Sequence, residues 1–150
     1  MTDQSTSQRR QEVIARLKAA RDGFQKCIED VTAEASSKGT EWSIADLLRH
    51  STGVYQPLIT RLLEENSPDL GGRYDPEIGW SRAKESLMND IDKNISAAND
   101  MSDDQLEKSG QRNGETVDVL NVLTLMANHY DEHLAQLRNE VRIREGLKQV

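Results

Sequence analysis

Two histidines lie four residues apart in the stretch "NHYDEHLAQL", residues 128–137. If this stretch is helical, His129 and His133 share one face and are close enough to bind one metal ion. The chain has 3 histidines in all, and the third, His50, ends the stretch "WSIADLLRH". The chemistry of the chain therefore depends on whether three imidazoles meet.

Three imidazole ligands would suit a catalytic metal site. Zinc held by three protein side chains keeps one position open for water or substrate, and imidazole also suits nickel, copper and iron. His50 taken alone is better explained as a hydrogen-bonded core histidine. All three together favour a metal site, because three buried imidazoles without an ion would each need separate hydrogen-bond partners.

Four helices are expected to position these residues. Apolar residues at steps of three and four predict helices over about 8–37, 43–62, 80–101 and 116–144. Ser43 is expected to cap the second helix and Thr116 the fourth, with Asp118 suiting the positive end of the fourth. His50 falls on the inward stripe of the second helix, and the inward stripe of the fourth is expected to comprise Val119, Val122, Met126, His129, His133 and Leu137.

This pattern predicts an all-α protein, an antiparallel four-helix bundle. No stretch alternates convincingly enough to predict a strand. The 150 residues suit a single domain over 1–150, with residues 1–7 forming a frayed, flexible N-terminus.

Composition disfavours several classes of protein. The net charge of -7 disfavours binding to nucleic acid. One cysteine, Cys27, allows no disulfide within the chain. The polar N-terminus lacks the apolar region of a signal peptide, and no apolar run is long enough to cross a membrane. A soluble cytoplasmic protein without membrane or nucleic-acid partners is expected.

Two motifs resemble the DinB/YfiT-like superfamily. "EWSIADLLRH" resembles its second-helix motif, with a Trp, a Ser or Thr cap, and a His after a Leu pair. "NGETVDVLNVLTLMANHYDEHLAQLR" resembles its last-helix motif, with a Gly, a Thr cap, and H-x-x-x-H followed by a Gln. The resemblance implies a four-helix bundle, often dimeric, in which His50, His129 and His133 bind zinc, nickel or another divalent ion such as iron or manganese.

The resemblance also implies an activity. The DinB/YfiT-like superfamily includes thiol-dependent S-transferases and an isomerase that uses low-molecular-weight thiols. We therefore expect a metal-dependent transferase that uses such a thiol as cofactor and a small electrophilic molecule as substrate, acting as a homodimer. Two alternatives stay open: a metal-dependent hydrolase in which water is the nucleophile, and a metal-binding or dimerising bundle without turnover.

Two residues beside the histidines are further candidates for a catalytic role. "HYDEH" also fits H-x-x-E-H, the inverted zincin motif, in which Glu132 would be the general base. This interpretation is disfavoured, because those enzymes take another ligand well downstream and only 17 residues follow His133. Gln136, one turn beyond His133, could orient a water or a substrate at the metal.

For several other residues, a structural role explains their presence at least as well as a functional one. Tyr130 and Asp131 could hydrogen-bond a neighbouring imidazole, but are expected to pack between helices or face outward. Cys27 is expected to be buried as a small hydrophobe. The long loop that contains Arg73, Tyr74 and Asp75 could cover the metal pocket.

Overall fold

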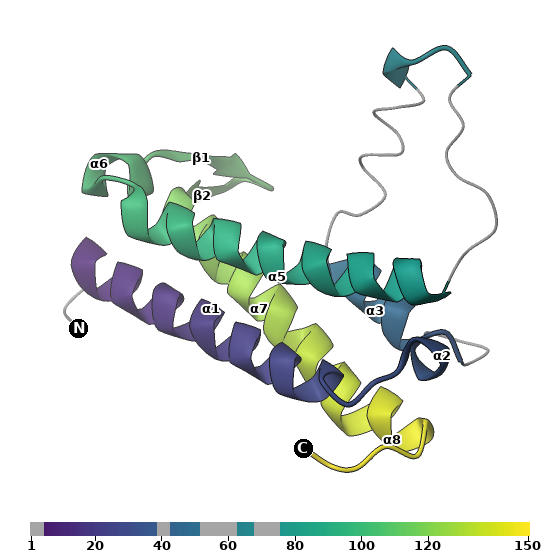
Figure 1. Ribbon diagram of the computed structural model, residues 1–150. Coiled ribbons are helices and arrows are strands. Elements are labelled where there is room, and N and C mark those ends of the chain that lie inside the picture. Colours follow the sequence, from purple (N-terminus) through teal and green to yellow (C-terminus); the bar gives the residue numbers. More distant parts are fainter. Residues whose placement is uncertain (1–4, 39–42, 52–62, 68–75) are drawn as a thin grey trace.

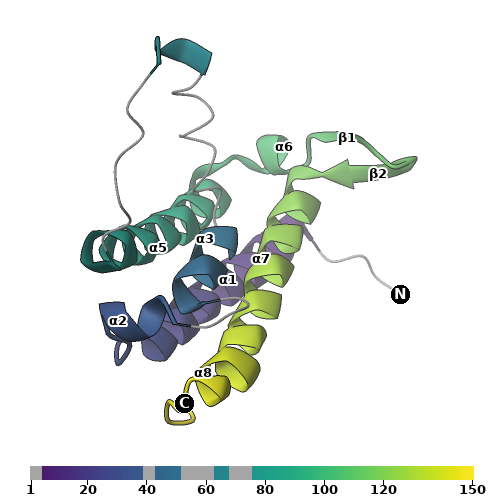
Figure 2. The ribbon, with the colours of Figure 1, turned by 90° about the vertical axis from the view of Figure 1, so that its right-hand side faces the viewer.

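Helices α1 (Thr6–Ile28), α5 (Pro76–Asp100) and α7 (Val119–Gln136) form the frame of the computed structural model. The structure describes residues 5–38, 43–51, 63–67 and 76–150, and only the backbone of residues 49–51 and 76–78. Helices α1 and α5 run side by side with α7 crossing behind them (Figure 1), and α3 (Ile44–Ser51) lies between α5 and α7 (Figure 2). The predicted all-α class is confirmed.

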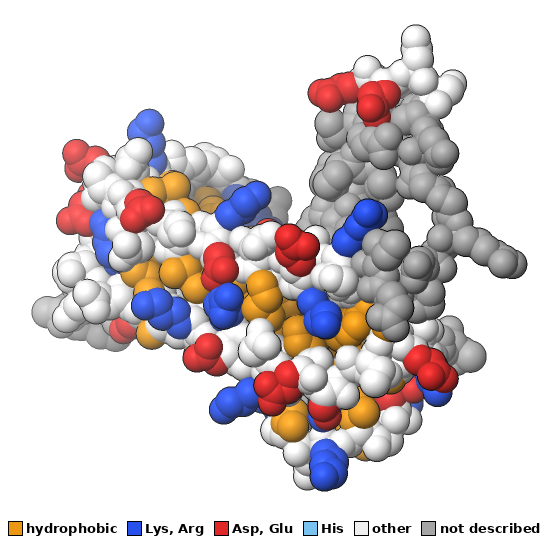
Figure 3. All heavy atoms as spheres, in the orientation of Figure 1, with side chains coloured by type: hydrophobic (Ala, Val, Ile, Leu, Met, Phe, Trp, Pro, Cys, Tyr) orange, Lys and Arg blue, Asp and Glu red, His pale blue; other side chains and the backbone are white. Residues whose placement is uncertain are grey.

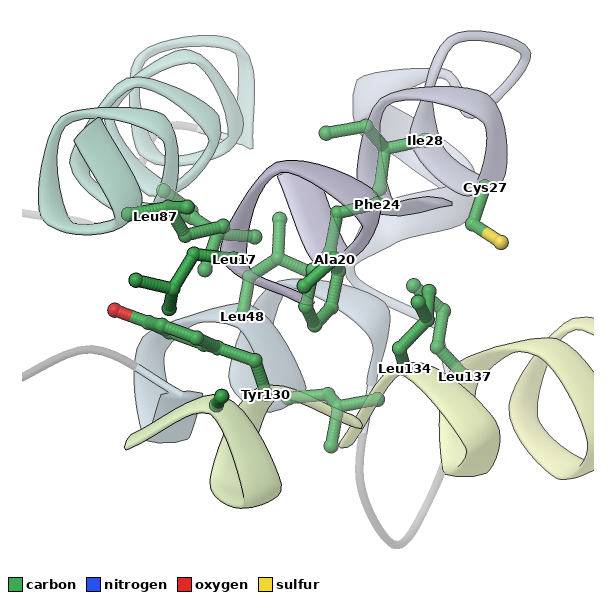
Figure 4. Packing of buried hydrophobic residues seen from close by; sticks show 14 of the residues in the cluster. Leu17, Ala20, Phe24, Cys27, Ile28, Leu48, Leu87, Tyr130, Leu134 and Leu137 are labelled. Atoms are coloured by element: carbon green, nitrogen blue, oxygen red, sulfur yellow. The ribbon is translucent and has the colours of Figure 1, made fainter. Parts of the chain in front are cut away.

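The long helices pack on one apolar core. Leu17 and Phe24 of α1 meet Leu87 of α5 and Leu134 of α7 there (Figure 4). Helices α1 and α7 pack tightly at Gly23, where an added Cβ would lie 2.5 Å from Leu134 Cδ2. Glycine at this position therefore allows the close crossing, because any larger residue would force the leucine to move.

The outer faces of the bundle are charged. Figure 3 shows acidic and basic side chains interspersed on one face, with apolar surface visible in the seam between α1 and α5. Within the described residues, no helix is long and apolar enough to span a membrane.

The first helix ends earlier than predicted. Instead of continuing to residue 37, α1 stops at Ile28 and a separate short helix, α2 (Ala33–Ser36), follows. Thr32 caps α2, because its hydroxyl accepts a hydrogen bond from the Ala35 backbone N–H at 3.1 Å. The turn between the two helices places Asp30 against Arg142, near the C-terminal end of the chain. The local periodicity of the sequence does not reveal such a contact.

Two other helices begin much as expected. Ser43 accepts a hydrogen bond from the Asp46 backbone N–H at 3.1 Å, so the predicted cap of α3 is confirmed. Helix α5 begins at Pro76, a few residues before the predicted start near Trp80. Proline suits the first turn because its fixed φ is helical and its missing N–H would have no helical partner there.

A β-hairpin precedes the last long helix, contrary to the expectation of no strand. Strands β1 (Ser109–Arg112) and β2 (Glu115–Asp118) pair in antiparallel fashion after the short helix α6 (Asp103–Leu106). Asn113 has φ of 51° and Gly114 has φ of 80°. Positive φ at both central residues defines the tight hairpin turn for which Asn-Gly is the preferred sequence.

The hairpin also changes the start of the last helix. Thr116 lies in β2, so it is not the cap, and Asp118 caps α7 instead. The Asp118 carboxylate accepts from the Asn121 backbone N–H at 2.7 Å, and the Asn121 side chain accepts from the Asp118 N–H at 2.8 Å. The helix continues through a π-helical segment, Leu137–Val141, into α8 (Arg142–Arg144), so its predicted end is confirmed.

Candidate metal centre

The two histidines of α7 lie against each other. Their ring centroids are 4.5 Å apart and their planes make an angle of 84°, so one ring meets the other edge to face. Both side chains are half-buried. The spacing of one helical turn thus places two imidazoles against each other on residues that are only partly buried.

Gln136 contacts the second histidine. Its Oε1 lies 3.3 Å from Nδ1 of His133, one turn along the helix, in a partly buried position. An amide oxygen accepts a hydrogen bond, so this arrangement suits a proton on Nδ1. The other ring nitrogen, Nε2, then carries the lone pair that a metal ion needs.

His50 completes the predicted set from another helix. Its backbone lies in α3, which packs against both α5 and α7. Leu47 and Leu48, earlier in the same helix, are fully buried. The side chain of His50 lies outside the described residues, so the convergence of three imidazoles stays a prediction. Among the side chains that are described, no three His, Cys, Asp or Glu residues gather as a metal site would require.

The histidines lie at the margin of the buried face of α7, which corrects the predicted inward stripe. Val122 is 47% exposed and Met126 is only partly buried. Of the predicted stripe, Leu137 is fully buried as expected. Within α7 the buried face is formed by Leu120, Leu123, Ala127, Tyr130 and Leu134. Apolar residues surround most of this helix, so their pattern alone does not select which side faces the core.

The neighbours of the histidines have other partners. Asp131 accepts a hydrogen bond from Arg16 at 2.7 Å on the outside of the bundle. Glu132 is exposed to solvent. The expectations that Asp131 faces outward and that Glu132 belongs to a solvated face therefore agree with the structure.

Tyr130 is buried and belongs to a polar group, formed with the partly buried Asp90 and Asn94, that was not predicted from the sequence. Its hydroxyl donates to Asp90 Oδ2, and Asn94 Nδ2 donates to the hydroxyl at 2.8 Å. Burial, together with the hydrogen bond to Asp90, raises the pKa of Tyr130 well above its ordinary value. The sequence signal that could have revealed this polar group is the spacing of Asp90 and Asn94, which puts two polar side chains on one face of α5.

The other candidates lie away from the histidines or outside the described residues. Cys27 is fully buried in the core, as predicted (Figure 4). Arg73, Tyr74 and Asp75 are outside the described residues. A shallow pocket in the seam between α1 and α5 involves no residue of α7; it is lined by Gln25, Ile28, Glu29, Lys84, Glu85 and Met88.

Comparisons with known proteins identify the family. The chain is similar to the solved structure of YfiT from Bacillus subtilis, with a TM-score of 0.59 and 16% identity over 99% of this chain and 93% of that one. That protein is described as a probable metal-dependent hydrolase with an unusual four-helix bundle topology, and the likeness shows the fold. No curated protein matches the chain. The family model of the DinB superfamily matches residues 16–137, which is more than half of the chain, and the protein therefore belongs to the DinB superfamily.

Proposed function

We propose that the protein binds one divalent metal ion through His50, His129 and His133 and transfers a low-molecular-weight thiol to a small electrophilic substrate. The observation that supports the metal site is the edge-to-face pair formed by His129 and His133 on α7, whose ring centroids are 4.5 Å apart. Membership of the DinB superfamily supports the proposal. The resemblance of "EWSIADLLRH" and of the last-helix motif to the superfamily implies His50 as the third ligand. The thiol is proposed because the superfamily includes members that use thiols.

The donor atoms present suit such an ion. His133 places its Nδ1 beside Gln136 Oε1, which leaves Nε2 available for a metal. Imidazole nitrogens bind zinc and nickel well, and iron or manganese is an alternative. When bound, a divalent cation lowers the pKa of a thiol in contact with it and so supplies a nucleophile at neutral pH.

The chain's own residues have separate roles in this proposal. His129 and His133 would hold the ion at the margin of the bundle, where both residues are partly exposed to solvent. Tyr130 keeps its proton because its pKa is raised, and its hydroxyl is bound to Asp90. Its hydrogen bonds to Asp90 and Asn94 support the packing of α7 on α5.

A second candidate is a metal-dependent hydrolase that uses the same three histidines. Its support is the description of the similar YfiT structure as a probable metal-dependent hydrolase. In this case water replaces the thiol as the nucleophile. A third candidate is a bundle that binds metal without turnover. We also expect a homodimer in the cytoplasm, and light scattering on the purified protein would measure the mass of the assembly.

Elemental analysis of protein purified without chelators tests the metal site first, followed by calorimetric titration of the metal-free protein with zinc and with nickel. We expect one ion per chain. His129→Ala should abolish most of the binding, whereas the control Asn139→Ala, at an exposed position further along the same helix, should not. A folded wild-type protein that binds neither ion would refute the proposal.

The reaction is tested by following the loss of a haloarene or an epoxide with and without added thiols. Loss that requires a thiol, together with formation of the thioether, supports the transferase. Loss without a thiol supports the hydrolase. Stoichiometric metal binding with no reaction across both series would favour the bundle without turnover.

A further inference from the structure

The contact between Gln136 and His133 has a specific geometry. The amide oxygen of Gln136 lies 3.3 Å from Nδ1 of His133, and both side chains are partly buried at the end of α7. The two residues are three apart on one helix, so their side chains are neighbours on its surface. The π-helical segment begins at Leu137, directly after Gln136. Gln136 therefore lies where the regular helix ends.

We propose that Gln136 is a positioning residue that fixes the tautomer of His133, with the proton on Nδ1 and the lone pair on Nε2. This inference rests on the proposed metal site for its purpose, but its geometry is a property of the metal-free protein. A neutral imidazole has one N–H and one acceptor nitrogen, and the partner of one nitrogen decides the state of the other. In water, free histidine favours the proton on Nε2, which would block that nitrogen as a ligand.

The hydrogen bond to Gln136 would thus reverse the ordinary preference before any ion arrives. It would also restrict rotation of the His133 ring. Residues that orient a ligand in this way typically contribute about 10–100-fold to metal affinity. Gln136 then acts through His133 and need not touch the ion or the substrate.

The proposal is tested by nitrogen-15 NMR of the histidine rings in the metal-free protein, at a pH at which the imidazoles are neutral. Nitrogen shifts distinguish a protonated from an unprotonated ring nitrogen. We expect His133 to carry its proton on Nδ1. In Gln136→Leu the proton should move substantially to Nε2, whereas Gln136→Glu should preserve the wild-type tautomer because a carboxylate also accepts a hydrogen bond.

A matched control removes a glutamine elsewhere. Gln149, exposed near the C-terminus, can be replaced in Gln149→Leu without affecting the site, so the spectrum of His133 should be unchanged. Circular dichroism and thermal unfolding establish that each variant is folded. Titration with zinc should then give about 10-fold weaker binding for Gln136→Leu and near wild-type binding for Gln136→Glu.

The possible results separate this inference from the proposed function. A proton on Nε2 in the wild-type protein, or a tautomer that Gln136→Leu leaves unchanged, overturns the role of Gln136 whether or not metal binds. The expected tautomer in a protein that binds no metal supports the hydrogen bond and refutes the metal site. The expected tautomer with unchanged zinc affinity in folded Gln136→Leu overturns the positioning role.

Discussion

The position of the two α7 histidines at the margin of the core suits a site for small molecules. A fully buried imidazole would be separated from solvent, and a fully exposed one would lack neighbours to hold its ring. His129 and His133 are half-buried, and each ring restricts the other through their edge-to-face contact. The proposed metal site would thus combine access with order, which metal chemistry on a dissolved substrate requires.

The third ligand can be tested at the residue scale through His50→Ala. If His50 binds the ion, losing one of three ligands should weaken zinc binding by more than the roughly 10–100-fold typical of a residue that only orients a ligand. Isothermal titration of the folded variant measures this change. An affinity equal to that of the wild-type protein would show that the site consists of the α7 pair with other donors.

Glu132→Gln separates the two catalytic candidates. Glu132 is exposed, and because it directly precedes His133, its side chain points to a different side of the helix. We therefore expect the variant to have normal metal content and a nearly unchanged rate of thiol transfer. If Glu132 were the general base of an inverted zincin, the rate would fall by about 10²–10⁴-fold. Steady-state rates at equal metal occupancy decide between these outcomes. A large loss would favour hydrolysis with Glu132 as the base.

At the scale of elements, α5 and α7 are joined by hydrogen bonds inside the bundle as well as by apolar packing. Tyr130 from α7 reaches Asp90 and Asn94 of α5 (Figure 4 shows its hydroxyl directed toward the side of Leu87). Buried polar groups are costly unless each is satisfied, and this group satisfies the hydroxyl as donor and acceptor. The pairing therefore favours one alignment of the two helices.

Tyr130→Phe should destabilise the protein by about 1–3 kcal/mol, because it leaves Asp90 and Asn94 without their shared partner while preserving the ring. Urea denaturation of wild type and variant measures the free energy of unfolding. A double-mutant cycle with Asp90→Asn isolates the coupling between the two side chains. Additive effects of the two substitutions would show that the hydrogen bond contributes nothing to stability.

The hairpin offers a matched pair of glycines. Gly114 has φ of 80°, whereas Gly110 has no such positive φ, and an added Cβ would have open space at both positions. We expect Gly114→Ala to destabilise the hairpin by about 1–2 kcal/mol through the left-handed conformation alone, and Gly110→Ala to have a much smaller effect. Amide exchange in β1 and β2 measures the difference. Equal protection in both variants would contradict the tight Asn-Gly turn.

At the scale of the whole molecule, Arg142 connects the turn after α1 to the C-terminal segment. Its guanidinium, buried at the end of the last helix, donates to the Cys27 backbone oxygen at 2.7 Å and to both carboxylate oxygens of Asp30 at 2.6 and 2.8 Å. It also donates to the Lys148 backbone oxygen at 2.7 Å. Bidentate pairing of this kind is geometrically specific, so Arg142 fixes the turn after α1 against the C-terminus.

Acid should weaken this connection. The hydrogen bond from Arg142 lowers the pKa of Asp30, and that from Arg9 lowers the pKa of Asp118. A carboxyl whose pKa is lower in the folded than in the unfolded state contributes stability above the unfolded value, about 3.9, and loses it as the pH falls through the folded value. We therefore expect the free energy of unfolding to decline as the pH drops below about 4.

Urea denaturation at a series of pH values measures this decline, and Asp30→Asn should make it shallower. Asp118→Asn should do the same, and because asparagine also caps helices, it should retain most of the stability of α7 at neutral pH. The two sites share no partner, so the double variant should show additive changes in slope. A slope unchanged in Asp30→Asn would show that its carboxylate does not contribute to acid stability.

The sequence by itself determined the local features of this protein. Helix spacing predicted the bundle, Ser43 predicted the start of α3, and the separation of His129 from His133 predicted that their rings would be neighbours. These predictions hold because each depends on residues within one or two turns of helix. The Asn-Gly pair at 113–114 was an equally local signal for the hairpin, and with it for the cap at Asp118.

Only the tertiary structure decided which side of α7 faces the core, where α1 ends and which side chain Tyr130 binds. Apolar residues surround most of α7, so its orientation depends on how α1 and α5 pack against it. The first helix stops at Ile28, and in the turn that follows Asp30 pairs with Arg142, a residue more than one hundred positions away. Such features depend on contacts between distant segments, and the energy of those contacts exists only once the chain has folded.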